Sequence, residues 1–190
     1  MKDLKDRIRT QGKYLGKGIL KVDGFINHQV DPILMKSCGS ALASKFSDVA
    51  ATKILTAEIS GIAPALMTAM YLNLPVVYAR KHKPVTMPDE VLLTLAPSHT
   101  KGRLVELIIS PEYLQAGEKA LIIDDFLASG QTILGLANLA EAAGADVVGI
   151  GTLIEKTFED GRSALSKLNV PIKSLAPISE ISESNIVFAD

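Results

Sequence analysis

Two features of the sequence predict an α/β protein with a parallel sheet core flanked by helices. From residue 53 onward, apolar runs of strand length alternate with segments of helical period, which is typical of a parallel sheet buried on both faces. Hydrophobic residues make up 47% of the chain and charged residues 22%, a composition that argues against a disordered or fibrous chain. The length of 190 residues favours one domain, 1–190.

The alternation predicts two βαβ units. The first has strands at 53–57 and 76–80 and a helix at 63–72. The second has strands at 120–124 and 147–155, joined by a turn at 126–131 and a helix that ends near residue 143. Both units place the carboxyl ends of their strands at one edge of the sheet, which is the edge where open α/β sheets bind ligands.

The segments before and after these units have a different character. The first fifty residues favour a helix over residues 2–12 and a second helix that opens at Asp31-Pro32, where an acceptor side chain precedes a proline with a preset φ. Residues 17–28 lie between these helices. Their apolar side chains follow neither a helical nor a strand period, so we expect them to form a loop. The last thirty residues are mixed, and we expect them to form a peripheral layer docked on the sheet.

A long polar segment separates the two units. Residues 81–103 are rich in Pro, Lys, His, Ser and Thr, and their number is large for a connection inside a compact α/β domain. The segment is either a functional lid or a disordered insert. We favour a flexible lid over residues 84–103, because loops beside a ligand-binding edge commonly carry function.

The charge balance and the cysteine content narrow the class of protein. With 20 Lys and Arg against 21 Asp and Glu, the net charge is −1, so the chain lacks the surplus of cations that a general nucleic-acid coat needs. No apolar run has membrane-spanning length, and the N-terminus carries no secretory signal. We therefore expect a cytoplasmic protein without nucleic-acid or membrane partners. The single cysteine, Cys38, excludes an internal disulfide and is interpreted as a small buried apolar residue.

The sharpest feature follows the strand at 120–124. This strand brings two carboxylates, Asp124 and Asp125, to the ligand edge, and a turn of small residues then opens a helix. Small side chains let backbone N–H groups approach a phosphate, hydroxyls add donors, and a helix N-terminus adds partial positive charge. The residues of this predicted anion-binding turn are Ala128, Ser129, Gly130, Gln131 and Thr132. The ligand implied is a phosphorylated polyol or sugar.

The two carboxylates also have plainer interpretations. One could cap the following helix while the other forms a surface ion pair. Because neighbouring residues on a strand point to opposite faces, Asp124 and Asp125 would not converge on one metal ion unless the strand had already ended. Hydrogen bonding to a sugar diol suits at least one of them better. We therefore predict no metal site built from protein ligands.

A basic cluster opens the polar segment. Arg80, Lys81 and Lys83 come directly after the strand at 76–80. Charge runs of this kind are usually only a solvated loop. Their place at the C-terminal end of a strand favours the other interpretation, in which they face an anion bound at the ligand edge.

The residues at this edge resemble those of a known family. Residues 121–132, LIIDDFLASGQT, are similar to the phosphoribosyl pyrophosphate signature of the type I phosphoribosyltransferases. The resemblance extends over most of the chain and is strongest to the bacterial members that act on xanthine. The other matching segments are 20–23 (LKVD), 25–29 (FINHQ), 60–65 (SGIAPA), 77–83 (VYARKHK), 149–151 (GIG) and 154–156 (IEK). Gln131 stands where many members of the family have a second glycine in the turn.

The resemblance implies a fold, a reaction and partners. It implies a type I phosphoribosyltransferase fold in which about residues 1–45 and 160–190 form a hood over a core of about residues 50–158. The implied reaction belongs to purine salvage: the 5-phosphoribosyl group of phosphoribosyl pyrophosphate is transferred to xanthine, giving xanthosine 5′-monophosphate and pyrophosphate. Mg²⁺ would be bound mainly through the phosphoribosyl pyrophosphate or pyrophosphate oxygens, and the protein would be a homodimer.

The resemblance also implies a role for each segment. Asp124 and Asp125 would be the catalytic residues that face the ribose, and the turn at 128–132 would hold the 5-phosphate. The residues expected to face pyrophosphate are Glu58, Ser60, Gly61, Arg80, Lys81 and Lys83. The residues expected to bind the purine are Leu20, Asn27, Phe126 and Lys156, with the lysine donating to a purine oxo group. The plain alternative for Lys156 is a surface pair with Glu155.

Three other functions compete with this one. A regulator that senses phosphoribosyl pyrophosphate could keep the same signature without catalysis, but it would need a DNA-reading module and a basic surface, and neither is expected here. A related enzyme could prefer guanine or hypoxanthine, because a lysine paired with an oxo group does not separate these bases from xanthine. A phosphoacceptor signalling domain would place its acidic pair after the first strand, and the order here differs.

Overall fold

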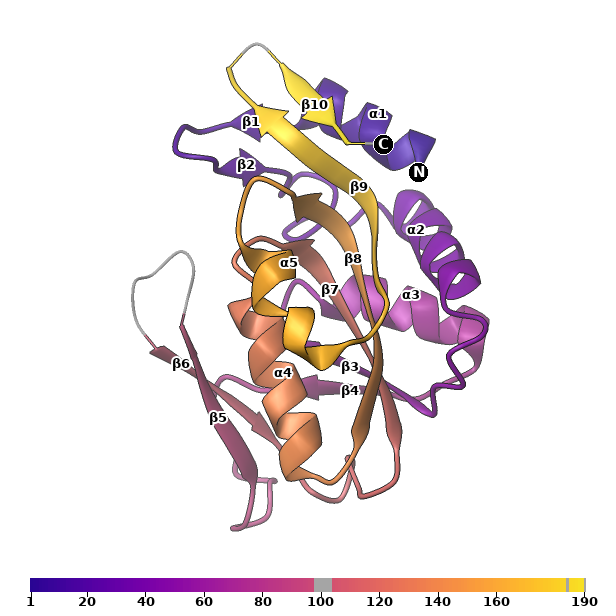
Figure 1. The fold of residues 1–190 in the computed structure, drawn as a ribbon, viewed down its shortest axis with the longest axis vertical. Helices are drawn as coiled ribbons and strands as arrows, with labels where there is room; N and C mark the ends of the chain where they lie inside the picture. The colour runs from indigo at the N-terminus through magenta and orange to yellow at the C-terminus, as the bar shows by residue number, and fades with distance from the viewer. Residues whose placement is uncertain (98–103, 184, 190) are drawn as a thin grey trace.

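The computed structural model describes residues 1–97, 104–183 and 185–189, which form a central sheet with flanking helices and two small hairpins (Figure 1). The helices are α1 (Lys2–Gln11), α2 (Pro32–Lys45), α3 (Ile62–Leu72), α4 (Gln131–Ala142), α5 (Gly161–Ala164) and the 3₁₀ helix η1 (Ser166–Leu168). The strands are β1 (Lys13–Tyr14), β2 (Leu20–Lys21), β3 (Lys53–Ala57), β4 (Val76–Ala79), β5 (Leu92–Pro97), β6 (Leu104–Ile109), β7 (Lys119–Leu127), β8 (Asp146–Lys156), β9 (Ile172–Ile181) and β10 (Ile186–Phe188).

The central sheet confirms the predicted fold class. Its six strands lie in the order β10-β9-β8-β7-β3-β4 among the described residues, and all neighbours are parallel except β10, which is antiparallel to β9. Side chains of β7 alternate between two apolar clusters, as a strand period of two requires. Leu121 and Ile123 join the cluster that includes α1, α2 and α3, whereas Ala120 and Ile122 join the one that includes α4. The sheet is therefore covered on both faces.

Glycines in β8 let α2 pack closely on the sheet. A Cβ on Gly149 would lie 2.9 Å from Cε1 of Phe46, and one on Gly151 would lie 2.9 Å from Cε2 of the same ring and 3.2 Å from Cδ2 of Leu42. The Phe46 ring thus occupies the space that side chains at these two positions would need. Although α2 lies within the segment that we assigned to the hood, its inner face is part of the core.

The N-terminal helices begin where the sequence indicates. Asp31 caps α2, because its carboxylate accepts hydrogen bonds from the backbone N–H groups of Ile33 and Leu34 at 3.0 Å each. This confirms the predicted opening at Asp31-Pro32. Within the stretch expected to be a loop, residues 20–21 form β2, which pairs with β1 in a short antiparallel hairpin.

The C-terminal segment differs from the expectation of a separate peripheral layer. The first part of β9 pairs in parallel with β8, and its last residues pair with β10, so both strands extend the central sheet. The α-ammonium of Met1 donates to the carbonyl oxygen of Leu175 at 2.6 Å, which ties α1 to β9. Figure 1 shows α1, β9 and β10 together at one end of the molecule, beside both chain termini. The two ends of the chain therefore lie together at this end of the molecule.

The described part of the polar segment, residues 81–97, contains a strand that the sequence did not predict. Residues 92–97 form β5, which pairs with β6 in an antiparallel hairpin that packs on α4. A Cβ on Gly135 of α4 would lie 2.9 Å from Leu107 and 3.2 Å from Ala96, so the glycine permits this close packing. Residues 98–103 of the predicted lid lie outside the described part of the chain. The lid over residues 84–103 stays a prediction.

Two further expectations concern the burial of Cys38 and membrane-spanning segments. Cys38 is fully buried, and this burial raises the pKa of its thiol to about 12, which agrees with its interpretation as an apolar core residue. In the described residues, no helix combines the length and the apolar character that crossing a membrane requires.

The contact between α2 and α3 gives a test of the fold. A Cβ on Gly39 would lie 2.5 Å from the backbone carbon of Met67, so Gly39→Ala must push the two helices apart. We expect the free energy of unfolding in urea to fall by about 2 kcal/mol, as is usual for overpacking. The exposed neighbour Lys36 provides the control, because Lys36→Ala should change it by less than about 0.5 kcal/mol. An equal effect of both variants would contradict the packing described.

Candidate functional site

A cavity of about 270 Å³ opens at the carboxyl ends of β3 and β7. The residues that line it come from β3 and its following loop, the end of β4, the β5–β6 hairpin, and β7 with the turn into α4. They are Ala57, Glu58, Ser60, Lys81, Ala96, Pro97, Val105, Leu107, Asp124, Asp125, Phe126, Ala128, Ser129, Gly130, Gln131, Thr132 and Ile133. Both predicted catalytic carboxylates and the whole predicted anion-binding turn therefore lie around one cavity.

The length of β7 explains why both carboxylates reach it. The sequence predicted that the strand ends at Asp124, but it continues to Leu127. Its pairing with β3 is limited to the first half and ends at the Leu55–Ile122 pair, whereas pairing with β8 continues to Leu127. The second half of β7 thus has an open edge toward the cavity, and two consecutive side chains can line it.

The turn after β7 has the backbone of an anion-binding site. Gly130 has φ 76° and ψ −1°, a left-handed conformation that favours glycine, and it precedes α4 without any side-chain cap. The first N–H groups of a helix have no partner within the helix, and its N-terminus carries partial positive charge. In the described residues, the hydroxyls of Ser129 and Thr132 have no hydrogen-bond partner, so both remain available to a ligand.

Asp125 is held from two sides. Asn27 Nδ2 donates to Asp125 Oδ2 at 3.0 Å, and Ser60 Oγ donates to Asp125 Oδ1 at 3.0 Å. The backbone N–H of Asp125 donates in turn to Asp124 Oδ1 at 2.9 Å. These bonds connect the hood, the loop after β3 and the end of β7, so they set the orientation of the carboxylate before any ligand binds.

The carboxyl group of Asp124 is strongly perturbed by its surroundings. Burial raises the pKa of its carboxyl well above the ordinary value of 3.8, and the charge of Asp125 raises it further. The loop after β3 approaches this group closely: a Cβ on Gly61 would lie 2.1 Å from Thr56 Oγ1 and 2.7 Å from Asp124 Oδ1. Only glycine leaves room here, which explains the small residue in this loop.

The loop after β3 is joined to the end of β4 through Glu58. Its carboxylate accepts the backbone N–H of Lys81 at 2.8 Å and forms an ion pair with Arg80 Nε at 2.8 Å. The peptide bond between Glu58 and Ile59 is cis. Through these contacts, the two predicted pyrophosphate-facing segments form one unit at the edge of the cavity.

Only part of the basic cluster points to the carboxylates. Among the described residues, Lys81 lines their cavity, but Arg80 lies with its guanidinium 5.8 Å from the Tyr78 ring centre and lines a second cavity of about 480 Å³. Lys83 Nζ donates to the backbone oxygen of Asp89 at 2.9 Å. The structure thus brings Lys81 to the carboxylates and places Arg80 and Lys83 elsewhere.

The four predicted purine-binding residues fall into two groups. Asn27 and Phe126 adjoin the carboxylates, one through its hydrogen bond to Asp125 and the other as part of the cavity wall. Leu20 and Lys156 do not line this cavity. Leu20 is buried in the apolar cluster that includes α1 and α2, and Lys156 Nζ donates to Glu159 Oε1 at 3.0 Å with a side chain only 10% exposed.

Sequence reasoning missed one wall of the cavity. Ala96, Pro97, Val105 and Leu107 belong to the β5–β6 hairpin, and the sequence analysis treated half of this hairpin as a polar lid. The short apolar run at 92–96, LLTLA, was the available signal for a strand, although the alternating exposure of its side chains in the structure does not follow an alternation of polar and apolar residues.

Comparison with known proteins identifies the family. The family model of the phosphoribosyl transferase domain matches residues 44–188. The chain belongs to the phosphoribosyltransferase family. It is 48% identical to the xanthine phosphoribosyltransferase of Deinococcus deserti over 190 residues, which cover 100% of this chain and 98% of that protein. It is 49% identical to the xanthine phosphoribosyltransferase of Lactococcus lactis subsp. cremoris over 189 residues, 100% of this chain and 96% of the relative.

A solved structure supports the same fold. The adenine phosphoribosyltransferase of Thermoanaerobacter pseudethanolicus has a TM-score of 0.75 to this chain at 27% identity, and the match covers 93% of this chain and 98% of that protein. The type I fold expected from the resemblance is thereby confirmed.

The burial of Asp124 predicts a pH-dependent gain in stability for Asp124→Asn. Since folding raises the pKa of this carboxyl, ionisation opposes folding above the ordinary pKa of 3.8, and stability falls as the pH rises from there. At pH 7 the variant should gain on the order of 1 kcal/mol in urea unfolding, and this gain should vanish near pH 3. Asp146→Asn, at an exposed position, should show no such dependence. A variant less stable than the parent at pH 7 would contradict this prediction.

Proposed function

We propose that this protein is a xanthine phosphoribosyltransferase that acts in purine salvage. It transfers the 5-phosphoribosyl group of phosphoribosyl pyrophosphate to xanthine, and the products are xanthosine 5′-monophosphate and pyrophosphate. The observation that carries the choice of xanthine is the identity of 45–49% over the whole chain to relatives of that name. The cavity that joins two carboxylates to an anion-binding turn supports the chemistry.

In this reaction a purine ring nitrogen forms a bond to the anomeric carbon while the bond from that carbon to the pyrophosphate oxygen breaks. Positive charge develops on the ribose, so the main task of the site is to stabilise it there. We assign Asp124 and Asp125 to the ribose. Asp125, oriented by Asn27 and Ser60, faces the sugar as a hydrogen-bond acceptor, and the turn at 128–132 holds the 5-phosphate by its backbone N–H groups and hydroxyls.

The pyrophosphate would lie on the other side of the ribose. Ser60, Gly61 and Lys81 adjoin the carboxylates and supply an N–H-rich loop and a positive charge, while Glu58 orients the backbone of Lys81. Arg80 and Lys83 are included in this role only if the loop after β4 changes its conformation when the substrate binds. Closure of residues 84–103 would then exclude water, which would otherwise hydrolyse the activated sugar.

Magnesium fits this site as a partner of the substrate. In the parts of the chain that the structure describes, no three His, Cys, Asp or Glu side chains come together to hold a metal ion. The donors beside the cavity, Asp124 and Asp125, suit an ion held mainly by pyrophosphate and ribose oxygens. Bound there, Mg²⁺ would neutralise charge on the leaving pyrophosphate.

The base would bind between the hood and the carboxylates. Asn27 reaches the site from the hood, Phe126 offers a ring, and Leu20 closes the apolar side. Lys156 donates to Glu159 in the structure, so a purine oxo group would have to compete for its ammonium group. Adenine offers no such acceptor, and discrimination of this type is strong because an unmatched buried polar group is costly.

A homodimer and a cytoplasmic location complete the proposal. Apolar side chains are exposed on α3 and on the edge strand β4, and a second copy of the chain could cover them. They are Leu66, Met70, Tyr71 and Tyr78. A single buried thiol suits a reducing compartment.

Pyrophosphate release with four purines tests the function. With Mg²⁺ and phosphoribosyl pyrophosphate present, xanthine should give the highest kcat/KM, guanine and hypoxanthine lower values, and adenine none that can be measured. A higher kcat/KM for guanine or hypoxanthine would make the protein a different oxopurine enzyme. No pyrophosphate with any of the four would leave binding without catalysis, as in a regulator.

Replacement of the lysine tests how the base is recognised. Lys156→Ala removes the proposed donor to the oxo group, so the KM for xanthine should rise at least about tenfold, while the KM for phosphoribosyl pyrophosphate should stay within about twofold. Lys173→Met, at an exposed position on the adjacent strand, is the control and should change neither. Equal increases in both constants for Lys156→Ala would show that the residue does not belong to the base pocket.

A further inference from the structure

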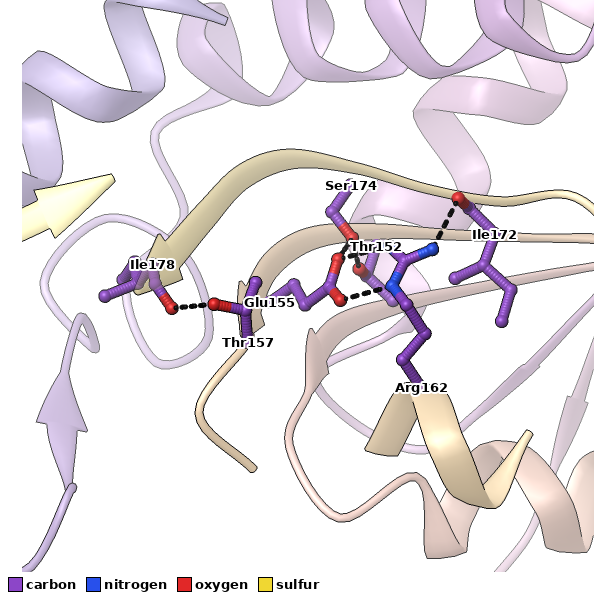
Figure 2. Close-up of polar contacts among 7 residues, drawn as sticks. All are labelled: Thr152, Glu155, Thr157, Arg162, Ile172, Ser174 and Ile178. Atoms are coloured by element: carbon purple, nitrogen blue, oxygen red, sulfur yellow. Dashed lines mark hydrogen bonds and ion pairs between the residues drawn. The ribbon is translucent and has the colours of Figure 1, made fainter. Parts of the chain in front are cut away.

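A charge network lies behind the phosphate turn and outside the cavity, and it joins a buried carboxylate to an arginine whose side chain is 54% exposed. Glu155, at the end of β8, is 2% exposed and receives two hydrogen bonds from Arg162 of α5: Nε to Oε1 at 2.8 Å and Nη2 to Oε2 at 2.7 Å. Figure 2 shows the guanidinium facing the carboxylate in this paired geometry. Planar pairs of this type are the strong, direction-dependent form of the ion pair.

The network joins α5 to two strands. Ser174 of β9 donates from Oγ to Glu155 Oε2 at 2.6 Å, and its hydroxyl also lies 2.9 Å from Thr152 Oγ1 of β8. Arg162 Nη1 reaches the backbone oxygen of Ile172 at 3.3 Å (Figure 2). Burial by itself raises the pKa of Glu155, but the hydrogen bonds from Arg162 and Ser174 bring it below its ordinary value, so the carboxylate is charged at neutral pH.

The residue before Arg162 touches the phosphate turn. A Cβ on Gly161 would lie 2.2 Å from the carbonyl oxygen of Ala128, and a Cβ on Gly130 would lie 2.9 Å from the carbonyl oxygen of Gly161. The backbone of α5 therefore lies directly against the backbone of the turn, with no side chain between them. A shift of α5 by a few tenths of an ångström must be transmitted to Ala128 and Gly130.

Two contacts hold α5 at this place. Leu165, at its C-terminal end, is buried in the apolar cluster with α4, and Arg162, at its N-terminal end, is paired with Glu155. The turn itself is held less firmly, since the hydroxyls of Ser129 and Thr132 have no partner in the described structure. At the end of α5 nearest the turn, Arg162 anchors the helix through its ion pair with Glu155 and its hydrogen bond to the Ile172 oxygen, and Gly161 packs beside Leu127.

We propose that Arg162 and Glu155 are positioning residues for the 5-phosphate. Their ion pair holds Gly161 against the turn at 128–132 and so keeps the N–H groups of that turn in the geometry that a phosphate needs. Binding groups that are displaced by even a fraction of an ångström lose much of their effect. The inference deepens the proposed function, because it explains how the substrate's 5-phosphate site is kept in shape by residues that do not touch the substrate.

Ligand binding without turnover gives the sharpest test. Ribose 5-phosphate carries the phosphate that the turn would hold, and pyrophosphate does not, so calorimetry with each separates this turn from the rest of the site. In Arg162→Lys, which keeps the charge but loses the paired geometry, the Kd of ribose 5-phosphate should rise about tenfold, and that of pyrophosphate should stay within about twofold. In steady-state assays, the KM for phosphoribosyl pyrophosphate should rise and the KM for xanthine should not.

A double variant tests the role of the ion pair in a protein that should still fold, and a second variant is its control. Arg162→Met alone leaves a buried carboxylate without its partner, so Glu155→Met is combined with it to replace the whole pair by apolar side chains. This double variant should fold and should still bind ribose 5-phosphate less tightly. The exposed Lys167, in η1, supplies the control, and Lys167→Met should bind both ligands as the parent does.

The outcomes separate this inference from the proposed function. An unchanged Kd for ribose 5-phosphate in the folded double variant, or equal weakening of ribose 5-phosphate and pyrophosphate, would overturn the positioning role. If the parent protein released no pyrophosphate with any purine, the proposed enzyme would be wrong, yet a selective loss of ribose 5-phosphate binding in Arg162→Lys would still support the role of the ion pair.

Discussion

The site depends on one constraint in the sheet, namely that β7 runs further than its neighbour β3. Pairing with β3 ends at Ile122, so the last residues of β7 have a free edge on that side, and the cavity lies beside this edge. Two carboxyl groups can lie side by side there only because the cost of bringing two like charges together is reduced at each of them. Asp125 receives hydrogen bonds from Asn27 and Ser60, while Asp124 keeps its proton more readily than an ordinary acid. Every other functional segment is arranged around this edge.

The charges around the cavity match the substrate that we propose. Phosphoribosyl pyrophosphate has anionic groups at two ends and a sugar between them. The protein places the N-terminus of α4, Lys81 and the acidic pair around one cavity. A transition state that carries positive charge on the sugar is therefore surrounded by complementary groups in a fixed arrangement, which is how preorganised sites lower barriers. Because the net charge of the chain is only −1, this complementarity depends on where the charged groups lie and not on the total charge.

Short-range signals made much of the architecture predictable. The cap at Asp31, the strand at 53–57 and the turn after Asp125 follow from side chains a few residues apart. Contacts across long sequence distances were not predictable in this way. Residues 172–181 were expected to belong to a peripheral layer because the strand β8 that pairs with them lies in a different part of the chain. Glu155 is a different case: Arg162 is near it in sequence, but only the turn between them brings the two side chains together. The sequence indicated Arg80 for the site, but it did not indicate that the guanidinium pairs with Glu58 and lies near the Tyr78 ring.

The N-terminal helix α1 packs against the C-terminal strand β9, and this affects the order in which the protein can assemble. Leu4 and Ile8 of α1 are fully buried in a cluster that contains Leu175 and Ile178 of β9. During synthesis on the ribosome, α1 emerges first and β9 last, so these apolar side chains can be covered only in part, by α2 and its neighbours, until residues 172–188 have been made. Newly made chains that stop before β9 would expose this surface and are natural clients for chaperones. Asn27, which orients Asp125 from the hood, would reach its final place only after that late step.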